Sequence, residues 1–128
     1  MDLRWPLRSE EERCDGVIVL TLTGRLGAAS AGPFGTGLAQ AIGPGNARVV
    51  IDLQGVDYIS SAGLAALATA AGLCVRNHGS LVLCGLTDPV RVALDLGGLL
   101  PELAIEPSRE EALFRLTASA APLPADEG

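Results

Sequence analysis

The segment from residue 49 to residue 79 constrains the fold of this chain more than any other part. It begins with Val49, Val50 and Ile51, three consecutive β-branched residues, and Asp52 and Leu53 follow. Such a run is typical of a strand that is buried on both faces of a sheet. After a short link, apolar residues recur at the spacing of one helix face, at Leu64, Leu67, Ala68, Ala71 and Val75. The segment therefore predicts a buried strand, a short link and a helix.

Two adjacent serines, Ser60 and Ser61, stand directly before this predicted helix. The first turn of a helix presents free backbone N–H groups and a partial positive charge, so a phosphate can rest there. Serine is also a favoured N-cap residue, and capping alone is an alternative interpretation of both side chains.

Turn and capping residues divide the rest of the chain into alternating strands and helices. The predicted strands are Leu3–Leu7, confined to a sheet edge by Pro6, then Val17–Thr23, Val49–Leu53, Leu81–Cys84 and Leu103–Ile105. Glu10–Arg13 is predicted as a polar turn between the first two strands, which pair as a hairpin. The other predicted helices begin near Ser30, Asp88 and Ser108. This order predicts an α/β fold, with a mixed, mostly parallel sheet of four to five strands and about four helices.

A chain of 128 residues is long enough for one domain with its own core. We expect residues 1–117 to form this domain and the Ala/Pro-rich residues 118–128 to be a disordered tail. Hydrophobic residues make up 48% of the chain and aromatic residues only 3%, so the predicted core is aliphatic. The predicted core residues include Val50, Ile51, Leu53, Leu64, Leu67, Leu83 and Leu94.

The charge pattern argues against nucleic acid and against an anionic membrane as partners. The net charge is −6, and the nine basic residues, all arginine, are dispersed along the chain. The three cysteines, Cys14, Cys74 and Cys84, have no C-x-x-C spacing, and the last two fit small buried hydrophobic positions. They indicate a reducing, cytoplasmic setting. The chain shows no signal-peptide pattern and no apolar run long enough for a bilayer.

Residues suited to catalysis or metal binding are scarce. The one histidine, His78, lies at the far end of the helix that Ser61 begins, roughly 25 Å away, so a Ser–His pair is excluded within one chain. Asp52 and Asp57 could hold Mg²⁺ only weakly, and carboxylates at a strand end are more typical of solvated or capping groups. A chain without lysine has no P-loop. We therefore expect no enzyme activity, no cofactor and no metal site.

Four blocks of the chain resemble the STAS domains, specifically the anti-anti-sigma factors, which are also called anti-sigma factor antagonists. Asp57–Leu64, with its Ser-Ser-Ala-Gly-Leu run, is similar to the family's signature. The other three, which follow the family's order, are Leu20–Leu26, Val49–Leu53 and Asp88–Leu99. The resemblance covers roughly residues 13–117.

This resemblance implies a cytoplasmic regulator that is not an enzyme. In the family, the unphosphorylated protein binds an anti-sigma factor, which is a serine kinase, and so frees the sigma factor. The kinase then phosphorylates the family's serine and ends the binding, and a serine phosphatase restores it. The acceptor serine matches Ser61, with Ser60 as a rival, and the implied partner-binding residues are Asp57, Ser60, Ser61, Ala62 and Gly63. Two positions depart from the common family pattern, because Ser60 and Gly27 stand where an acidic residue is frequent.

Two other functions are compatible with the sequence. The chain could be a STAS adaptor that is never phosphorylated, as a subunit of a signalling or transport assembly. It could also be a small nucleotide- or lipid-binding domain, or an enzyme with an unrecognised site.

Overall fold

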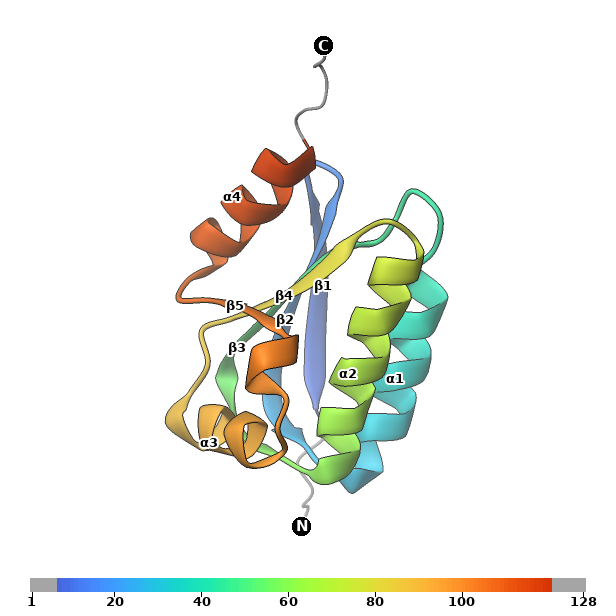
Figure 1. Ribbon diagram of the computed structural model, residues 1–128. Coiled ribbons are helices and arrows are strands. Elements are labelled where there is room, and N and C mark those ends of the chain that lie inside the picture. The colour runs from blue at the N-terminus through green and yellow to red at the C-terminus, as the bar shows by residue number, and fades with distance from the viewer. Residues whose placement is uncertain (1–6, 121–128) are drawn as a thin grey trace.

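Five strands form one mixed sheet, and their order in the sheet follows their order in the chain (Figure 1). The computed structural model describes residues 7–120. The strands are β1 (Arg8–Cys14), β2 (Val17–Leu26), β3 (Arg48–Ile59), β4 (Ser80–Cys84) and β5 (Ala104–Glu106). β1 runs antiparallel to β2, whereas β2, β3, β4 and β5 are parallel to their neighbours. The predicted mixed, mostly parallel sheet is therefore confirmed, whereas the antiparallel pair at its edge uses a different first strand from the predicted hairpin.

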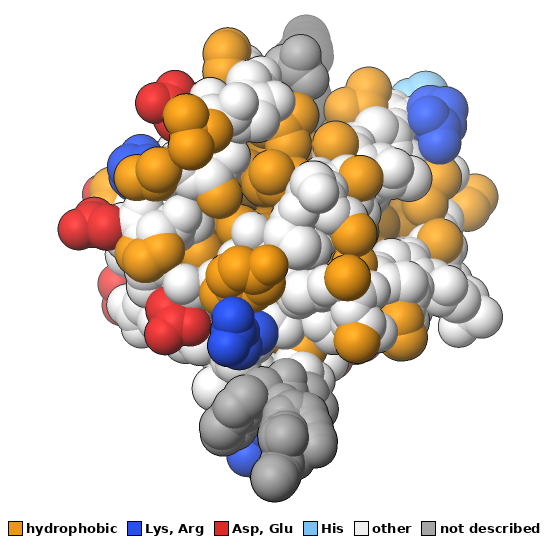
Figure 2. All heavy atoms as spheres, turned by 90° about the horizontal axis from the view of Figure 1, so that it is seen from below, with side chains coloured by type: hydrophobic (Ala, Val, Ile, Leu, Met, Phe, Trp, Pro, Cys, Tyr) orange, Lys and Arg blue, Asp and Glu red, His pale blue; other side chains and the backbone are white. Residues whose placement is uncertain are grey.

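Helices cover both faces of this sheet. α1 (Ala28–Ala41) and α2 (Ser61–Arg76) run side by side on one face, and α4 (Arg109–Ala120) lies on the other (Figure 1). α3 (Asp88–Leu96) and the short 3₁₀ helix η1 (Leu100–Glu102) lie at the lower end of the molecule, which Figure 2 shows from below. The α/β class with about four helices is confirmed.

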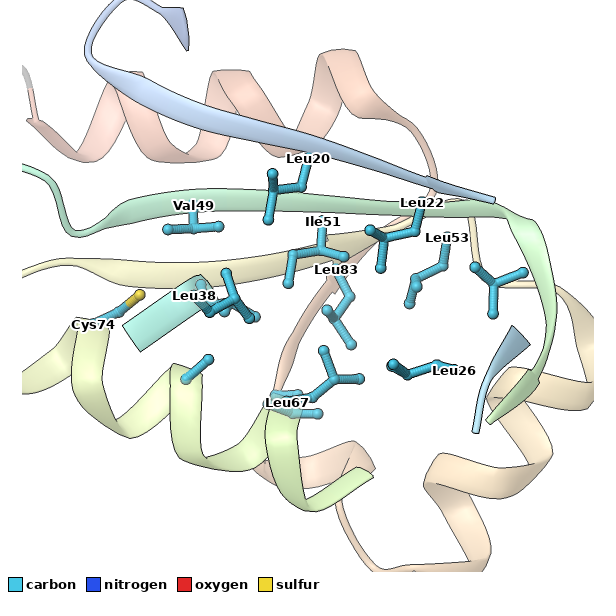
Figure 3. Packing of buried hydrophobic residues seen from close by; sticks show 14 of the residues in the cluster. Leu20, Leu22, Leu26, Leu38, Val49, Ile51, Leu53, Leu67, Cys74 and Leu83 are labelled. Carbon is cyan, nitrogen blue, oxygen red and sulfur yellow. The ribbon is translucent and has the colours of Figure 1, made fainter. Parts of the chain in front are cut away.

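Alternation along β3 divides the core between the two faces of the sheet. Val49, Ile51 and Leu53 face α1 and α2 and lie in one cluster with Leu67 of α2 (Figure 3). Val50 faces the opposite way and packs in a smaller cluster with residues of α4. Of the predicted core residues, all but Leu64 are fully buried, and Leu64 is half-buried against the larger cluster. Because the chain has few aromatic residues, both clusters are almost entirely aliphatic.

The first strand differs from the prediction. Glu10–Arg13, predicted as a polar turn, lies within β1, and the hairpin turn is formed by Asp15 and Gly16, both with positive φ. β1 is an edge strand whose first six residues are exposed, so it lacks the buried, alternating residues by which a strand is predicted. Of the predicted strand Leu3–Leu7, residues 3–6 lie outside the described residues and Leu7 precedes β1.

The short link predicted before α2 is also wrong, because β3 continues to Ile59. β2 likewise extends past Gly24 to Leu26, and its pairing with β3 shifts register twice, between Thr21 and Thr23 and between Gly24 and Leu26. Gly55 sits in the irregular part, where a Cβ would lie 2.9 Å from the Leu22 carbonyl oxygen. Because the backbone is irregular here, the residues of β3 after Leu53 do not show the alternation by which a strand is predicted.

The helices differ from the prediction in three details. α1 begins at Ala28, two residues before Ser30, and contains Pro33. On α2, Val75 is 66% exposed, and the fully buried positions are Gly63, Leu67, Ala70 and Cys74. α4 includes residues 118–120 of the predicted tail, and residues 121–128 lie outside the described residues.

Candidate functional site

Ser60 and Ser61 lie where β3 gives way to α2, as predicted, but in different environments. Ser60 is the N-cap, and its Oγ accepts a hydrogen bond of 3.1 Å from the Gly63 backbone N–H. Ser60 is half-buried, and its own N–H donates to the Leu26 carbonyl at 2.9 Å. Ser61 is the first residue of the helix and is exposed. The cap is thus formed by one serine, and the hydroxyl of the other faces solvent.

Gly63 brings the first turn of α2 directly onto the ends of two strands. A Cβ at Gly63 would lie 2.7 Å from the Leu26 carbonyl oxygen and 2.9 Å from Cγ1 of Ile59. Real Cβ atoms do not approach other atoms so closely, so this contact requires glycine. Its neighbour Ala62 is exposed beside Ser61. The Ser-Ser-Ala-Gly sequence therefore places a rigid, solvent-facing helix start at the carboxyl ends of β2 and β3.

An arginine near the end of β2 and a tyrosine near the end of β3, which the sequence did not single out, stack on each other. The guanidinium carbon of Arg25 lies 4.5 Å from the centroid of the Tyr58 ring. Tyr58 is 42% exposed and immediately follows Asp57, which is also exposed. A Cβ at Gly27 would lie 3.6 Å from Cε2 of Tyr58, so the ring lies against the position where a Gly27 side chain would begin. The pairing depends on the register of β2 and β3, which no local pattern reveals.

α3 forms the other side of this end of the molecule. The Thr87 hydroxyl precedes the helix and donates to the Val56 carbonyl at 2.7 Å, which joins the start of α3 to β3. A Cβ at Gly97 would lie 3.1 Å from Cδ1 of Leu64, so the end of α3 packs against the first turn of α2. Val92 and Leu96 on α3 are exposed, and Figure 2 shows apolar side chains gathered on this lower face. α3 therefore adds exposed apolar side chains to this end of the molecule.

Asp52 belongs to a separate polar cluster on the opposite face of the sheet. Its Oδ2 lies 3.2 Å from Nη2 of Arg109, the first residue of α4, and its Oδ1 accepts the Gln54 N–H at 3.0 Å. Arg109 also contacts the Thr21 hydroxyl and approaches Glu12 at 3.8 Å. The Asp52 carboxylate is thus a buried, paired group that joins β3 to α4.

Groups suited to nucleophilic or metal chemistry lie apart from Ser61. His78 follows α2, whose 16 residues span about 24 Å. Burial raises the pKa of the Cys74 thiol to about 11 and that of Cys84 to about 12, with the Asp52 charge adding to the effect at Cys84. Within residues 7–120, no three His, Cys, Asp or Glu side chains gather as metal ligands would. Across the same residues, no helix is both long and apolar enough to span a membrane.

Two comparisons with known proteins agree on the family of this chain. The model of the STAS domain family matches residues 9–112. The "Putative anti-sigma factor antagonist BtrV" of Bordetella bronchiseptica is 37% identical over 101 residues, which are 79% of this chain and 87% of that protein.

Solved structures share the fold at lower identity. An anti-sigma factor antagonist from Mycobacterium paratuberculosis superposes with a TM-score of 0.75 at 23% identity, covering 87% of this chain and 94% of that one. A serine-to-glutamate variant of Moorella thermoacetica RsbS superposes with a TM-score of 0.77 at 22% identity, covering 90% and 99%. The chain belongs to the STAS domain family, and its sequence is similar to that of an anti-sigma factor antagonist.

Proposed function

We propose that this chain is an anti-sigma factor antagonist whose binding to a cognate anti-sigma factor kinase is switched off by phosphorylation of Ser61. The observation that carries the proposal is the difference between the two serines. Ser60 is half-buried and its Oγ caps α2, whereas Ser61 is exposed on a rigid helix start. An incoming kinase can reach the Ser61 hydroxyl without breaking the cap. We assign partner contacts to Asp57, Ser60, Ser61, Ala62 and Gly63, and the cytoplasm as the place of action.

The names of similar proteins support this proposal. The relative from Bordetella bronchiseptica carries the name of an anti-sigma factor antagonist. One similar structure is that of the antagonist SpoIIAA in its unphosphorylated form, with a TM-score of 0.63 at 15% identity, covering 86% of this chain and 98% of that one. Another is the serine-to-glutamate variant of RsbS, a change that introduces a negative charge in place of a hydroxyl.

The proposed reaction is transfer of the γ-phosphoryl group of ATP to Ser61. A new O–P bond forms at the Ser61 oxygen as the bond to the β-phosphate oxygen breaks, ADP leaves, and the hydroxyl proton passes to solvent or a kinase base. This chain supplies only the acceptor, and the kinase supplies the catalytic groups. A serine phosphatase reverses the modification by hydrolysing the same O–P bond.

The phosphate is expected to act at the surface and to leave the fold intact. Phosphoserine adds about −1.5 to −2 charges, and a helix N-terminus stabilises such a charge by roughly 0.3–1 kcal/mol. Asp57 opposes it by a similar, screened amount, whereas Asp52 lies on the other face of the sheet beside Arg109. Because these effects nearly cancel, loss of binding comes from desolvating or displacing the charged group within the interface.

The test compares the parent protein with Ser61→Ala and Ser61→Asp. We expect all three to have similar melting temperatures, and we expect Ser61→Asp alone to lose binding to the co-purified anti-sigma factor in titration calorimetry. Ser60→Ala is the matched control: it should lose about 1 kcal/mol of stability with the cap and still accept phosphate at Ser61.

Two results would overturn the proposal. One is Ser61→Asp binding the partner as tightly as the parent. The other is phosphopeptide mass spectrometry, on protein from its native cell or treated with the kinase and Mg-ATP, that places the phosphate on Ser60.

A further inference from the structure

We propose that Arg25 is the intramolecular counter-ion of phosphorylated Ser61, held ready for the phosphate by its stacking on Tyr58. This inference rests on the proposed phosphorylation of Ser61 and specifies how the modified site is arranged. It follows from three features of the structure: where Arg25 lies, how it is held, and which charges are available to it.

Arg25 lies near the end of β2, and Ser61 begins α2 just after the end of the neighbouring strand β3. Leu26 pairs with Ile59 across β2 and β3, and the Ser60 N–H donates to the Leu26 carbonyl at 2.9 Å. Arg25 directly precedes Leu26, and Ser61 directly follows Ser60, so the hydrogen-bonded pair Leu26 and Ser60 lies between them. Since consecutive Cα atoms are about 3.8 Å apart and adjacent strands about 5 Å apart, their Cα atoms are at most about 13 Å apart. An extended arginine and a phosphoserine can close that separation.

Both the backbone and the side chain of Arg25 make a specific contact. The Arg25 carbonyl accepts a hydrogen bond of 3.0 Å from the Ser30 hydroxyl, which joins it to the first turn of α1. Its guanidinium lies over the Tyr58 ring at 4.5 Å. Gly27 has no side chain, and the Tyr58 ring lies beside the position that a side chain there would occupy. A guanidinium stacked on an aromatic face keeps its N–H groups at the edge, where they remain able to donate. The stacking contact thus leaves the hydrogen-bond donors of the cation available.

No carboxylate among the described residues pairs with Arg25. The ion pairs formed between described residues use Arg13, Arg109 and Arg115. The first turns of α1 and α2 contain no acidic residue, and Asp57 is the carboxylate closest to Ser61 along the chain. A phosphate on Ser61 would therefore be the strongest anion near this guanidinium, and the two can form charge-assisted hydrogen bonds.

The test measures the second pKa of the phosphate by ³¹P NMR. Phosphoserine is installed at position 61 during translation, so the experiment needs neither the kinase nor the anti-sigma factor. A guanidinium in contact favours the dianion, so we expect Arg25→Gln to raise the phosphate pKa by about 0.5–1 unit relative to the parent. Arg76→Gln, at the other end of α2, removes the same charge and should leave the pKa unchanged.

Two further variants separate charge from position. Arg25→Lys keeps the charge without the planar fork, so its phosphate pKa should lie between those of Arg25→Gln and the parent. Tyr58→Leu removes the stacking surface and should also give a phosphate pKa between these two values. Equal phosphate pKa values in Arg25→Gln and Arg76→Gln would overturn the proposal. That result would leave the proposed switch untouched, because the switch is judged by partner binding of Ser61→Asp.

Discussion

At the scale of single residues, the site depends most on Gly63, because it has no Cβ atom. Replacing Gly63 by alanine would place a Cβ 2.7 Å from the Leu26 carbonyl, so the first turn of α2 must move away from the strands. We expect Gly63→Ala to destabilise the protein by about 1–3 kcal/mol in urea denaturation. The same displacement would shift Ser61 and weaken partner binding.

Gly37 provides the matched control for this substitution. It is also a helical glycine, but a Cβ there would meet nothing within 4 Å. We therefore expect Gly37→Ala to stabilise the protein by up to about 1 kcal/mol, through better helix propensity and a less flexible unfolded chain. If both variants shift the midpoint in the same direction, steric contact does not explain the glycine at position 63.

At the scale of elements, Leu67 and Val75 separate the buried and exposed sides of α2. Leu67 has no exposed surface and packs among strand residues (Figure 3). Val75, in contrast, is 66% exposed. We expect Leu67→Ala to cost about 2–5 kcal/mol, because it leaves a cavity against the sheet. Val75→Ala should change the free energy of unfolding by less than about 0.5 kcal/mol. Equal losses would mean that the helix is rotated from the face described above.

α4 depends on a polar anchor as well as on its apolar contacts. Arg109 pairs with Asp52 at 3.2 Å and also contacts Thr21, while Arg48 reaches the Leu116 carbonyl at 3.4 Å near the other end of the helix. Arg109→Met leaves the buried Asp52 carboxylate without its counter-charge, so we expect a loss of about 1–3 kcal/mol.

Amide hydrogen exchange would locate that loss. Exchange should accelerate in α4 and stay unchanged in α2, because α4 can open without disturbing the other face of the sheet. The control is Arg91→Met, which removes an exposed charge on α3 and should accelerate neither helix. Uniform acceleration across the molecule would contradict a local anchor.

The sequence predicted those elements whose signals are local. The β-branched run at Val49–Ile51, the N-cap at Ser108, whose Oγ accepts the Glu111 N–H, and the Ser-Ser start of α2 all appear where expected. The sequence does not predict β1, because both faces of this strand are exposed and its residues show no hydrophobic alternation. On α2 the pattern places Leu67 correctly but puts the exposed Val75 on the buried side, because alanine and glycine occur all around the helix and leave little amphipathic contrast.

The candidate site was predictable only in part, for a related reason. Ser60 and Ser61 follow from capping chemistry and from the family resemblance. The pairing of Arg25 with Tyr58, and that of Asp52 with Arg109, joins residues 33 and 57 positions apart in the chain. Such pairs are set by strand register and helix docking, which the sequence pattern does not encode locally.

At the scale of the whole molecule, the buried thiols predict a loss of stability at alkaline pH. Burial raises the pKa of Cys74 to about 11 and that of Cys84 to about 12, from an ordinary value of 9.0. Between about pH 9 and pH 11 the unfolded chain therefore releases thiol protons that the folded protein keeps. Because the unfolded state then binds fewer protons, the free energy of unfolding falls as pH rises.

The expected slope approaches about 1.4 kcal/mol per pH unit for each thiol. Urea denaturation at several pH values would measure it, and the chain contains no lysine whose titration would overlap. The double variant Cys74→Ala, Cys84→Ala should be less stable at neutral pH but show a much flatter decline. An equally steep decline in that variant would assign the alkaline loss to other groups.

The order of the sheet has a consequence for how the chain folds during synthesis. Because each strand pairs with the next one along the chain, a ribosome delivers every new strand to the open edge of a sheet that already exists. α4 emerges last among the described elements, and with β1–β5 already paired, its absence leaves Val17, Val19, Val50 and Val82 uncovered. For that interval the nascent domain presents a valine-rich surface to chaperones and to other chains, and the arrival of α4 closes it.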